Sequence, residues 1–260
     1  MHITDTHCHL DHTAFDTDRA EILHRCQALA IKTIIVPGVL REGWDKLLTL
    51  CSQYDALVPA LGLHPMFVTH HQTSHLDDLA LYAKQHNLVA VGEIGLDFYH
   101  GPLNRDVQLR LFQSQLDIAS QANLPVILHV RKAHDLTLKT LRNNFSQGGI
   151  VHAFNGSLQQ AEQYIALGFK LGFGGMLTYS RANKLRLLAL KLPLDAIVLE
   201  TDAPDMVVAN HKGERNSPEY IIDSLSALAQ IRQLTSKEIA RITSLNAQRV
   251  LRLTEEKVKE

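Results

Sequence analysis

The sequence lacks most of the features that mark membrane, secreted or disulfide-stabilised proteins. No apolar run approaches the roughly 18 residues that a membrane span requires, and the chain does not start like a signal peptide. It holds only three cysteines, Cys8, Cys26 and Cys51, and no Cys-x-x-Cys pair. This set excludes a disulfide scaffold and a cysteine zinc knuckle, and it is typical of a reducing compartment. We therefore expect a cytoplasmic protein that does not bind a membrane.

The sequence also has little net charge and few aromatic residues. Of its 260 residues, 45% are hydrophobic, 20% are charged and 6% are aromatic, and the formal net charge is −1. This composition is ordinary for a globular protein, and we expect one domain over residues 1–260 that acts as a monomer. The charge is uneven, because residues 1–130 contain 8 basic and 14 acidic side chains and residues 131–260 contain 18 and 13. The basic excess suits an anionic ligand, although scattered surface side chains explain these counts equally well.

Short apolar runs alternate with amphipathic stretches along the chain. The apolar runs, which we interpret as strands buried on both faces of a parallel sheet, are residues 3–7, 33–36, 57–61, 89–93, 126–130, 150–153, 170–173 and 197–202. Helical patterns occupy residues 17–30, 41–53, 75–86, 104–121, 134–144, 158–167, 180–191, 218–231 and 236–253. This alternation predicts an α/β fold, a single (β/α)8 TIM-type barrel. A doubly wound open sheet is the alternative, but no Gly-x-Gly-x-x-Gly follows the first strand.

Local signals mark the ends of several predicted helices. Residues 157–160 (SLQQ) and 235–238 (TSKE) match the capping box, in which a hydroxyl and an amide or acid satisfy free backbone N–H groups. Gly168 lies just beyond the helix predicted at 158–167, where a left-handed residue is favoured. We expect the last helix, residues 236–253, to pack outside the barrel.

Histidines and carboxylates interrupt or end several of the apolar runs. The six residues at these positions are His7, His9, Glu93, His129, His152 and Asp202. His7 and His9 are one residue apart, so their side chains share one face of the first strand. Glu93 closes the fourth run and Asp202 closes the eighth. A single histidine at a strand end is more often structural, but in a barrel all six side chains would meet at the mouth that holds the active site.

A metal centre is the interpretation that accounts for the whole set. A polar group within an apolar strand is costly unless it finds a partner, and a cation is a partner for all six. Histidine and carboxylate ligands without cysteine suit Zn²⁺, Mn²⁺ or Fe²⁺, and suit Mg²⁺ less naturally. Six ligands exceed a four-coordinate site, so we expect two divalent ions bridged by a carboxylate. None of the predicted strands ends in a lysine, and Glu93 is therefore the expected bridge.

Six segments resemble, in order and spacing, the motifs of TatD-type metal-dependent deoxyribonucleases, a family within the amidohydrolase-like barrels. They are residues 3–11 (ITDTHCHLD), 92–97 (GEIGLD), 125–135 (PVILHVRKAHD), 152–157 (HAFNGS), 199–204 (LETDAP) and 215–218 (RNSP). Thr4, Asn155 and Ile197 depart from the usual family pattern, but none of them is a candidate ligand. The resemblance implies a hydrolase that acts on ester bonds and requires metal.

The resemblance also implies how the two ions are held. One ion would be bound by His7, His9, Glu93 and Asp202, and the other by Glu93, His129 and His152. The ions would be Mg²⁺, Mn²⁺ or Zn²⁺. Asp202 would also accept the proton of the attacking water, which makes Asp202 and Glu93 the candidate catalytic residues. Glu200 shares a strand face with Asp202 and either orients a ligand or forms an ion pair inside the barrel.

Four residues outside the ligand set are candidates for substrate binding. They are His64, Arg131, Arg215 and Asn216. An arginine offers a planar fork that suits a phosphate group. The alternatives are a salt bridge to Asp135 for Arg131 and a solvated loop position for Arg215.

Three functions are compared on this basis. The first, which the resemblance implies, is a deoxyribonuclease that cleaves phosphodiester bonds through an activated water, as a 3′–5′ exonuclease on single-stranded DNA ends. The second is a two-metal hydrolase of another ester or amide, such as an aminoacyl-tRNA deacylase. The third is a binding protein with a structural metal, but such a metal does not require six ligands at an open mouth. The sequence has no strong basic stripe, so tight nonspecific binding to duplex DNA is not expected.

Overall fold

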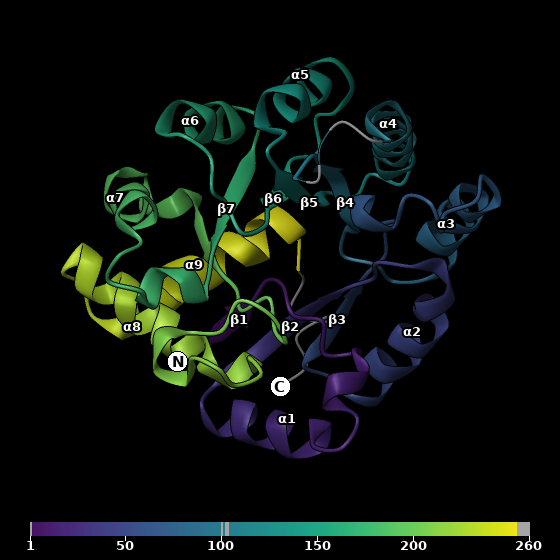
Figure 1. Ribbon diagram of the computed structural model, residues 1–260. Helices are drawn as coiled ribbons and strands as arrows, with labels where there is room; N and C mark the ends of the chain where they lie inside the picture. Colours follow the sequence, from purple (N-terminus) through teal and green to yellow (C-terminus); the bar gives the residue numbers. More distant parts are fainter. Residues whose placement is uncertain (1, 100, 102–103, 254–260) are drawn as a thin grey trace.

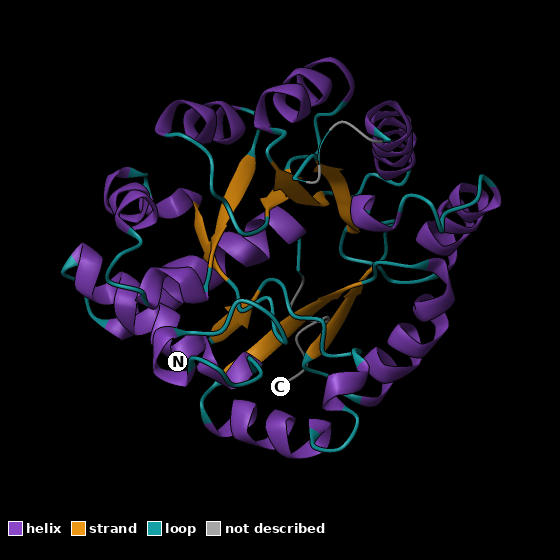
Figure 2. Ribbon diagram, in the orientation of Figure 1, coloured by secondary structure: helices purple, strands orange, loops and turns teal. Residues whose placement is uncertain are grey.

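The strands form a ring that is enclosed by helices (Figures 1 and 2). This computed structural model describes residues 2–99, 101 and 104–253. The strands are β1 (Ile3–Asp5), β2 (Ile31–Pro37), β3 (Leu57–Ala60), β4 (Val91–Asp97), β5 (Val126–Arg131), β6 (Gly149–Val151), β7 (Phe169–Phe173) and β8 (Ile197–Leu199). All the pairings between these strands of the described residues are parallel.

The helices follow the strands in regular alternation. They are α1 (Arg19–Ala28), α2 (Trp44–Gln53), α3 (Ser74–Gln85), α4 (Arg105–Gln121), α5 (His134–Asn144), α6 (Leu158–Ala166), α7 (Asn183–Lys191), α8 (Ile221–Arg232) and α9 (Ser236–Leu251). Both capping boxes are confirmed, at Ser157 for α6 and at Thr235 for α9, and Gly168 follows α6 with a φ of +82°. In the described part of the chain, no helix has both the length and the apolarity that crossing a bilayer requires.

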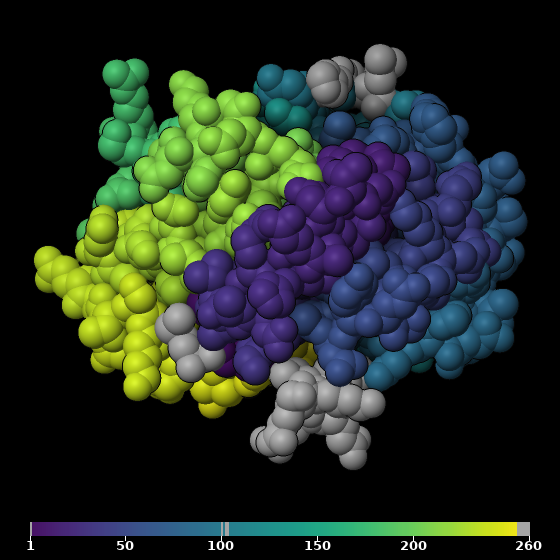
Figure 3. Space-filling model, turned by 90° about the horizontal axis from the view of Figure 1, so that it is seen from below, coloured from purple at the N-terminus to yellow at the C-terminus, as the bar shows by residue number. Residues whose placement is uncertain are grey.

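The ring is continued across two junctions between its sheets. The strands pair in the orders β1-β2-β3 and β4-β5-β6-β7-β8. At one junction Leu61 bridges Val91, and at the other the Thr6 amide donates to the Leu199 carbonyl over 3.0 Å. Figure 3 shows the beginning of the chain, in purple, between the light green segment near residue 210 and the blue segment near residue 50. The predicted (β/α)8 class is confirmed, and the open-sheet alternative is wrong.

The fourth strand differs from the sequence prediction. β4 runs from Val91 to Asp97, so Glu93 lies inside the strand and not at its end. Gly92 and Gly95 interrupt the apolar pattern, which explains why the sequence predicted this strand at residues 89–93. Gly95 has a φ of +143°, and a Cβ there would lie 2.0 Å from the His129 carbonyl oxygen. Only glycine therefore allows β4 and β5 to approach this closely beside the polar cluster.

The last helix lies outside the barrel, as expected, and covers one end of it. α9 covers the N-terminal end of the ring and does not pack on its outer wall (Figure 1). Its residues Ala247 and Val250 share a small apolar core with strand residues such as Ile127 and Val198. Asn246 donates through Nδ2 to backbone carbonyl groups that precede or begin β8. The lower opening is thus closed, and the open end is the one that carries the histidines and carboxylates.

Candidate metal centre

Four side chains from opposite sides of the ring converge at the open end. His7 and His9 follow β1, Glu93 lies in β4, and Asp202 follows β8. The Nε2 atoms of His7 and His9 are 3.2 Å apart, and they lie 3.1 and 3.5 Å from Glu93 Oε2. Both nitrogens lie 3.7 Å from Asp202 Oδ1. The same face of the barrel therefore presents two imidazoles and two carboxylates to one point.

These separations fit a bound cation. Donor atoms arranged tetrahedrally at about 2.1 Å from an ion are about 3.4 Å from one another. The five separations within this group range from 3.1 to 3.7 Å. His7 is fully buried, and its Nδ1 has no hydrogen-bond partner among the described residues, whereas its Nε2 faces the group. The fold thus directs His7 Nε2 toward the other donor atoms and leaves His7 Nδ1 buried without a hydrogen-bond partner among the described residues.

The second oxygen of Glu93 faces a different pair of imidazoles. Glu93 Oε1 lies 3.0 Å from His129 Nδ1 and 3.1 Å from His64 Nε2. The carboxylate thus has one oxygen in each of two donor groups, which is the arrangement that a bridging ligand requires. His64, a predicted substrate contact, lies directly on Glu93 and also lines the cleft, and its contact with substrate stays a prediction.

His152 lies against the first donor group, because its donor atom clusters with those of His7 and Glu93 and not with that of His129 among the described residues. Its ring stacks on that of His7 with centroids 3.6 Å apart, and its Nε2 is 3.6 Å from Asp202 Oδ1. Its Nδ1 is 3.1 Å from Glu200 Oε1, which also accepts the Ala153 amide over 2.6 Å. This contact is compatible with both interpretations of Glu200 made from the sequence, because His152 is at once its ion-pair partner and a candidate ligand.

Two further buried carboxylates position the histidines. Asp97 Oδ2 lies 2.9 Å from His129 Nε2, the nitrogen that faces away from Glu93. Asp5 accepts hydrogen bonds from the His7 amide and from the amide and hydroxyl of Thr201. Asp5 therefore ties the end of β1 to the segment that carries Asp202. Burial raises the pKa of Asp5 to about 8.

No lysine or arginine of the described residues balances the negative charge of the carboxylates in the cluster. Glu93, Asp97, Glu200 and Asp202 form ion pairs only with histidines, and no lysine or arginine of the described chain pairs with them. Buried carboxylates without such a partner are costly. A divalent ion would supply the missing positive charge, so the residues fit a metal.

Burial and neighbouring charges shift the titration of the cluster in opposite directions. Burial alone would raise the pKa of Glu93, but His64 and His7 hold it well below its usual value. Burial lowers the pKa of His7 well below its usual value, which keeps its lone pair available. Burial also opposes charge on His152, but Glu200 and Asp202 raise the pKa of His152 to about 10. Burial raises the pKa of Asp202 to about 6.

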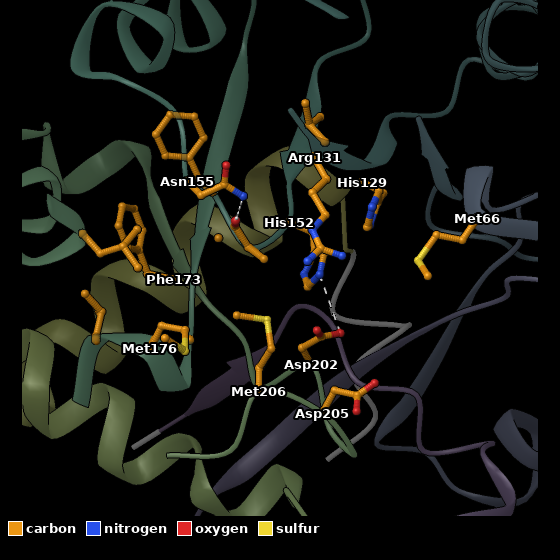
Figure 4. Close-up of a pocket in the computed structure, with 17 residues that line it drawn as sticks. Met66, His129, Arg131, His152, Asn155, Phe173, Met176, Asp202, Asp205 and Met206 are labelled. Carbon is orange, nitrogen blue, oxygen red and sulfur yellow. Dashed lines mark hydrogen bonds and ion pairs between the residues drawn. The ribbon is translucent and has the colours of Figure 1, made fainter. Parts of the chain in front are cut away.

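A cleft with two lobes opens over the cluster. The smaller lobe has a volume of about 400 Å³ and includes His9, Glu93 and His64 in its lining. The larger lobe has a volume of about 590 Å³ and extends over β7 and the segment after β8 (Figure 4). The residues shared by both lobes are Met66, His129, His152, Asp202 and Asp205. The donor cluster therefore lies where the two lobes meet.

The predicted substrate contacts differ in their relation to this cleft. Arg131 lines the larger lobe, with its guanidinium 3.6 Å from the centre of the Tyr99 ring. The alternative salt bridge from Arg131 to Asp135 is absent from the ion pairs of the described residues, and Asp135 accepts a hydrogen bond from Gln160. The Arg131 guanidinium is thus available at the cleft.

Arg215 and Asn216 lie behind the wall of the cleft. Arg215 forms a bidentate ion pair with Asp18 and packs over the Phe15 ring. Asn216 is fully buried, and its Nδ2 donates to the carbonyl oxygens of Thr201 and Asp205. Neither residue is among those described as lining the two lobes. Contact of either residue with substrate stays a prediction.

The site contains residues that the sequence did not single out for their roles. Asp97 was not among the candidate ligands or substrate contacts, and nothing in the pattern placed it on His129. Met66, Met176 and Met206 line the larger lobe, although a lone methionine carries no signal of a site. Glu200 was singled out by assuming strand parity with Asp202, although both residues follow β8, which ends at Leu199.

A parallel β/α barrel with imidazole and carboxylate donors at the C-terminal ends of its strands is the architecture of a metal-dependent hydrolase. Comparisons with known proteins agree. The family model described as TatD related DNase matches residues 4–252, so the chain belongs to the TatD family of metal-dependent hydrolases.

Individual relatives match over nearly their whole length. The chain is 41% identical to a protein of Escherichia coli K12 named an uncharacterized metal-dependent hydrolase, YjjV, over 91% of this chain and 92% of that protein. It is 38% identical to a protein of Haemophilus influenzae Rd that is also named an uncharacterized metal-dependent hydrolase, over 95% of this chain and 98% of that one.

Solved structures agree on the fold. The crystal structure of the E. coli TatD homologue YjjV superposes with a TM-score of 0.93 at 38% identity, over 97% of this chain and 98% of that one. A TatD family hydrolase of Entamoeba histolytica superposes with a TM-score of 0.85 over 96% of this chain and 98% of that one. At 20% identity, that second likeness concerns the fold alone.

Proposed function

We propose that the protein is a deoxyribonuclease that removes nucleotides from single-stranded 3′ ends of DNA, with two divalent ions at the cluster. The observation that carries this proposal is the position of the cluster at the junction of two lobes, with Arg131 in the larger lobe. A phosphodiester placed at the junction would have one nucleotide on each side. The family to which the chain belongs is described as related to DNases.

The two donor groups differ in their residues and share Glu93. The first ion would be held by His7, His9, Glu93 and Asp202, and the second by Glu93, His129 and His152. His64 lies on the Glu93 oxygen of the second group and is within reach of that ion. When bound, such ions act as Lewis acids that make water more acidic and offset the charge of the phosphate.

The protein's own side chains would perform the remaining steps. Asp202 would accept the proton of the attacking water, since it is the carboxylate that lines both lobes of the cleft beside His152. Glu200 and Asp97 would keep His152 and His129 in place through their second ring nitrogens. Arg131 would bind a phosphate oxygen through its planar fork.

The size of the cleft favours an unpaired strand end. Lobes of about 400 and 590 Å³ are of the size that encloses small organic ligands, which corresponds to one or two nucleotides in each. A paired duplex end would have to separate before its terminal phosphodiester reached the cluster. We therefore expect the enzyme to act on single strands and frayed ends.

A panel of substrates tests the proposal. The purified protein is incubated with 5′-labelled single-stranded DNA, duplex DNA, single-stranded RNA, aminoacyl-tRNA and small esters, each with EDTA or with Mg²⁺, Mn²⁺ or Zn²⁺. We expect a ladder of products, shortened stepwise from the 3′ end of single-stranded DNA, only in the presence of metal. Deacylation of aminoacyl-tRNA without shortening of DNA would overturn the proposal in favour of another ester as substrate.

A further inference from the structure

The methionines of the chain are concentrated in one place. The sequence has four, and the three after Met1 are Met66, Met176 and Met206, all of which line the larger lobe. They come from separate segments, which follow β3, β7 and β8. Their exposed fractions are 52%, 36% and 36%, so thioether groups face solvent at the rim of a cleft (Figure 4). The proposed hydrolysis uses none of them.

The segments that carry two of these methionines are fixed against each other. The Tyr179 hydroxyl donates to the Val207 carbonyl over 3.0 Å, and the Ala209 amide donates to the Thr178 hydroxyl over 2.8 Å. A Cβ at Gly175 would lie 2.2 Å from the Met206 carbonyl oxygen, so the backbones are in close contact. The apolar wall of the lobe is therefore built into the fold.

Met206 has a backbone conformation that its residue type disfavours. Its φ is +51°, in the left-handed region that glycine and asparagine usually occupy. A methionine persists there only if its surroundings hold it. In Figure 4 its side chain lies between Met176 and Asp202, next to the proposed reaction centre.

Polar groups border the apolar wall on the side of the cluster. The Arg131 guanidinium lies over the Tyr99 ring, and Arg131 forms no ion pair with a carboxylate of the described residues. Asn155 also lines the lobe, and its Oδ1 is 3.2 Å from His134 Nε2, while Nδ1 of the same ring lies 3.2 Å from the Tyr164 hydroxyl. The lobe thus combines a flat apolar surface with a cation and an oriented amide.

We infer that the larger lobe is a subsite for one unstacked base of the substrate strand, with Met176 and Met206 as the surface on which the base lies. The inference rests on the proposed nuclease function. Thioethers are polarizable and flexible, and they make favourable contacts with aromatic rings of different shapes. Such a surface binds every base, in the way that stacking platforms bind single strands without reading their sequence. The continuity of the lobe with the cluster through His152 and Asp202 places this base beside the bond that is cut.

Oligonucleotides that lack one base test the subsite. Single-stranded DNA with a normal end is compared with strands whose terminal or next-to-terminal nucleotide is abasic, using wild type, Met176→Ala, Met206→Ala and the double variant. We expect wild type to prefer the normal end by about tenfold in kcat/KM at one of these positions, because each thioether contact corresponds to a factor of about two to ten. The double variant should lower this preference to less than twofold. The four bases should differ from one another by less than about threefold.

Matched variants separate the contact from a general effect on the fold. Leu81→Ala removes an equally exposed apolar side chain on α3 and should keep the wild-type preference. Met176→Leu and Met206→Leu preserve the volume of the side chain and should keep most of the wild-type preference for the normal strand. If Met206→Ala lowers the melting temperature, Met176→Ala alone decides the comparison.

The preference for the normal over the abasic strand is also measured as a ratio of binding affinities, with fluorescence anisotropy of labelled strands in EDTA. This second measurement does not depend on cleavage. Equal treatment of normal and abasic strands by wild type in both assays would overturn the subsite and leave the nuclease function intact. A preference that survives unchanged in the double variant would place the base elsewhere and would also overturn it. Absence of cleavage of every nucleic acid, with hydrolysis of another ester, would refute the nuclease function first and the subsite with it.

Discussion

A single methyl group at Gly172 should disturb the metal centre without touching any proposed ligand. A Cβ there would lie 2.1 Å from Glu200 Oε2, whereas nonbonded contacts of a Cβ below 3.0 Å essentially do not occur. The carboxylate would have to move by about 1 Å, and with an exposed fraction of 2% it has no solvent into which to turn. The same carboxylate holds His152 Nδ1 and the Ala153 amide, so Gly172→Ala should release at least one of them.

The expected cost of Gly172→Ala follows from these contacts. Overpacking of a filled interior costs about 1–3 kcal/mol, and the loss of a hydrogen bond to a charged group costs about 1.5–3 kcal/mol. We expect a loss of about 3 kcal/mol in the free energy of unfolding, which lowers the melting temperature by about 6–12 °C. Because partners that orient a ligand contribute about 10–100-fold to metal affinity, affinity should fall by that factor.

Calorimetric metal titration and thermal unfolding provide the assay. Gly43→Ala is the control, since a Cβ at Gly43 meets nothing within 4 Å and its φ is −86°, so both quantities should stay near wild type. In a Glu200→Ala background the Gly172 methyl should have no further effect on metal affinity, because its target is gone. Wild-type affinity in Gly172→Ala, or an undiminished effect in the Glu200→Ala background, would refute the proposed role of Glu200.

Three further predictions follow from the site. Asp202→Asn keeps the size of the side chain but cannot accept a proton, so cleavage should fall by about 10²–10⁴-fold with partial metal retention; cleavage at the wild-type rate would exclude Asp202 as the base. Since the pKa of His152 is raised to about 10, this ring is protonated at pH 7, and metal binding should release at least one proton. The apparent affinity for metal should then rise by about tenfold per pH unit for each proton released. Calorimetry in buffers of different ionisation enthalpy measures this release, and a result of no release would contradict the prediction. Arg215→Ala breaks a half-exposed ion pair with Asp18 and should lower stability by about 1 kcal/mol with unchanged KM; a higher KM at unchanged stability would instead support substrate contact.

The sequence was sufficient for the fold because strands buried on both faces leave a strong apolar signal. Val126–Arg131 was recognised within one residue of its observed end, and α5 was placed at its observed bounds. β4 was misplaced, because Gly92 and Gly95 break the apolar pattern where the backbone needs close approach. That α9 covers one end of the barrel could not be predicted, because an amphipathic pattern shows which face is buried but not what it is buried against.

The candidate ligands could be identified because histidine and carboxylate are conspicuous inside apolar runs. The residues that position them were harder to detect. Asp97 lies four residues beyond Glu93, and the register of β4 on β5, which pairs Gly95 with His129, brings it to His129. The position of Arg215 was also beyond reach, because its partner Asp18 is distant in sequence and a loop arginine has the same appearance whether it binds substrate or a carboxylate.

The central claim is that one carboxylate, Glu93, holds two divalent ions together. Its most direct test is the metal content per chain of wild type and Glu93→Gln, measured by mass spectrometry after equilibration with Mn²⁺ or Zn²⁺ and gel filtration. Glutamine preserves the volume of the side chain but not its charge or its two equivalent oxygens. We predict about two ions per chain for wild type and fewer than one for a folded Glu93→Gln. Retention of two ions by Glu93→Gln would contradict the account.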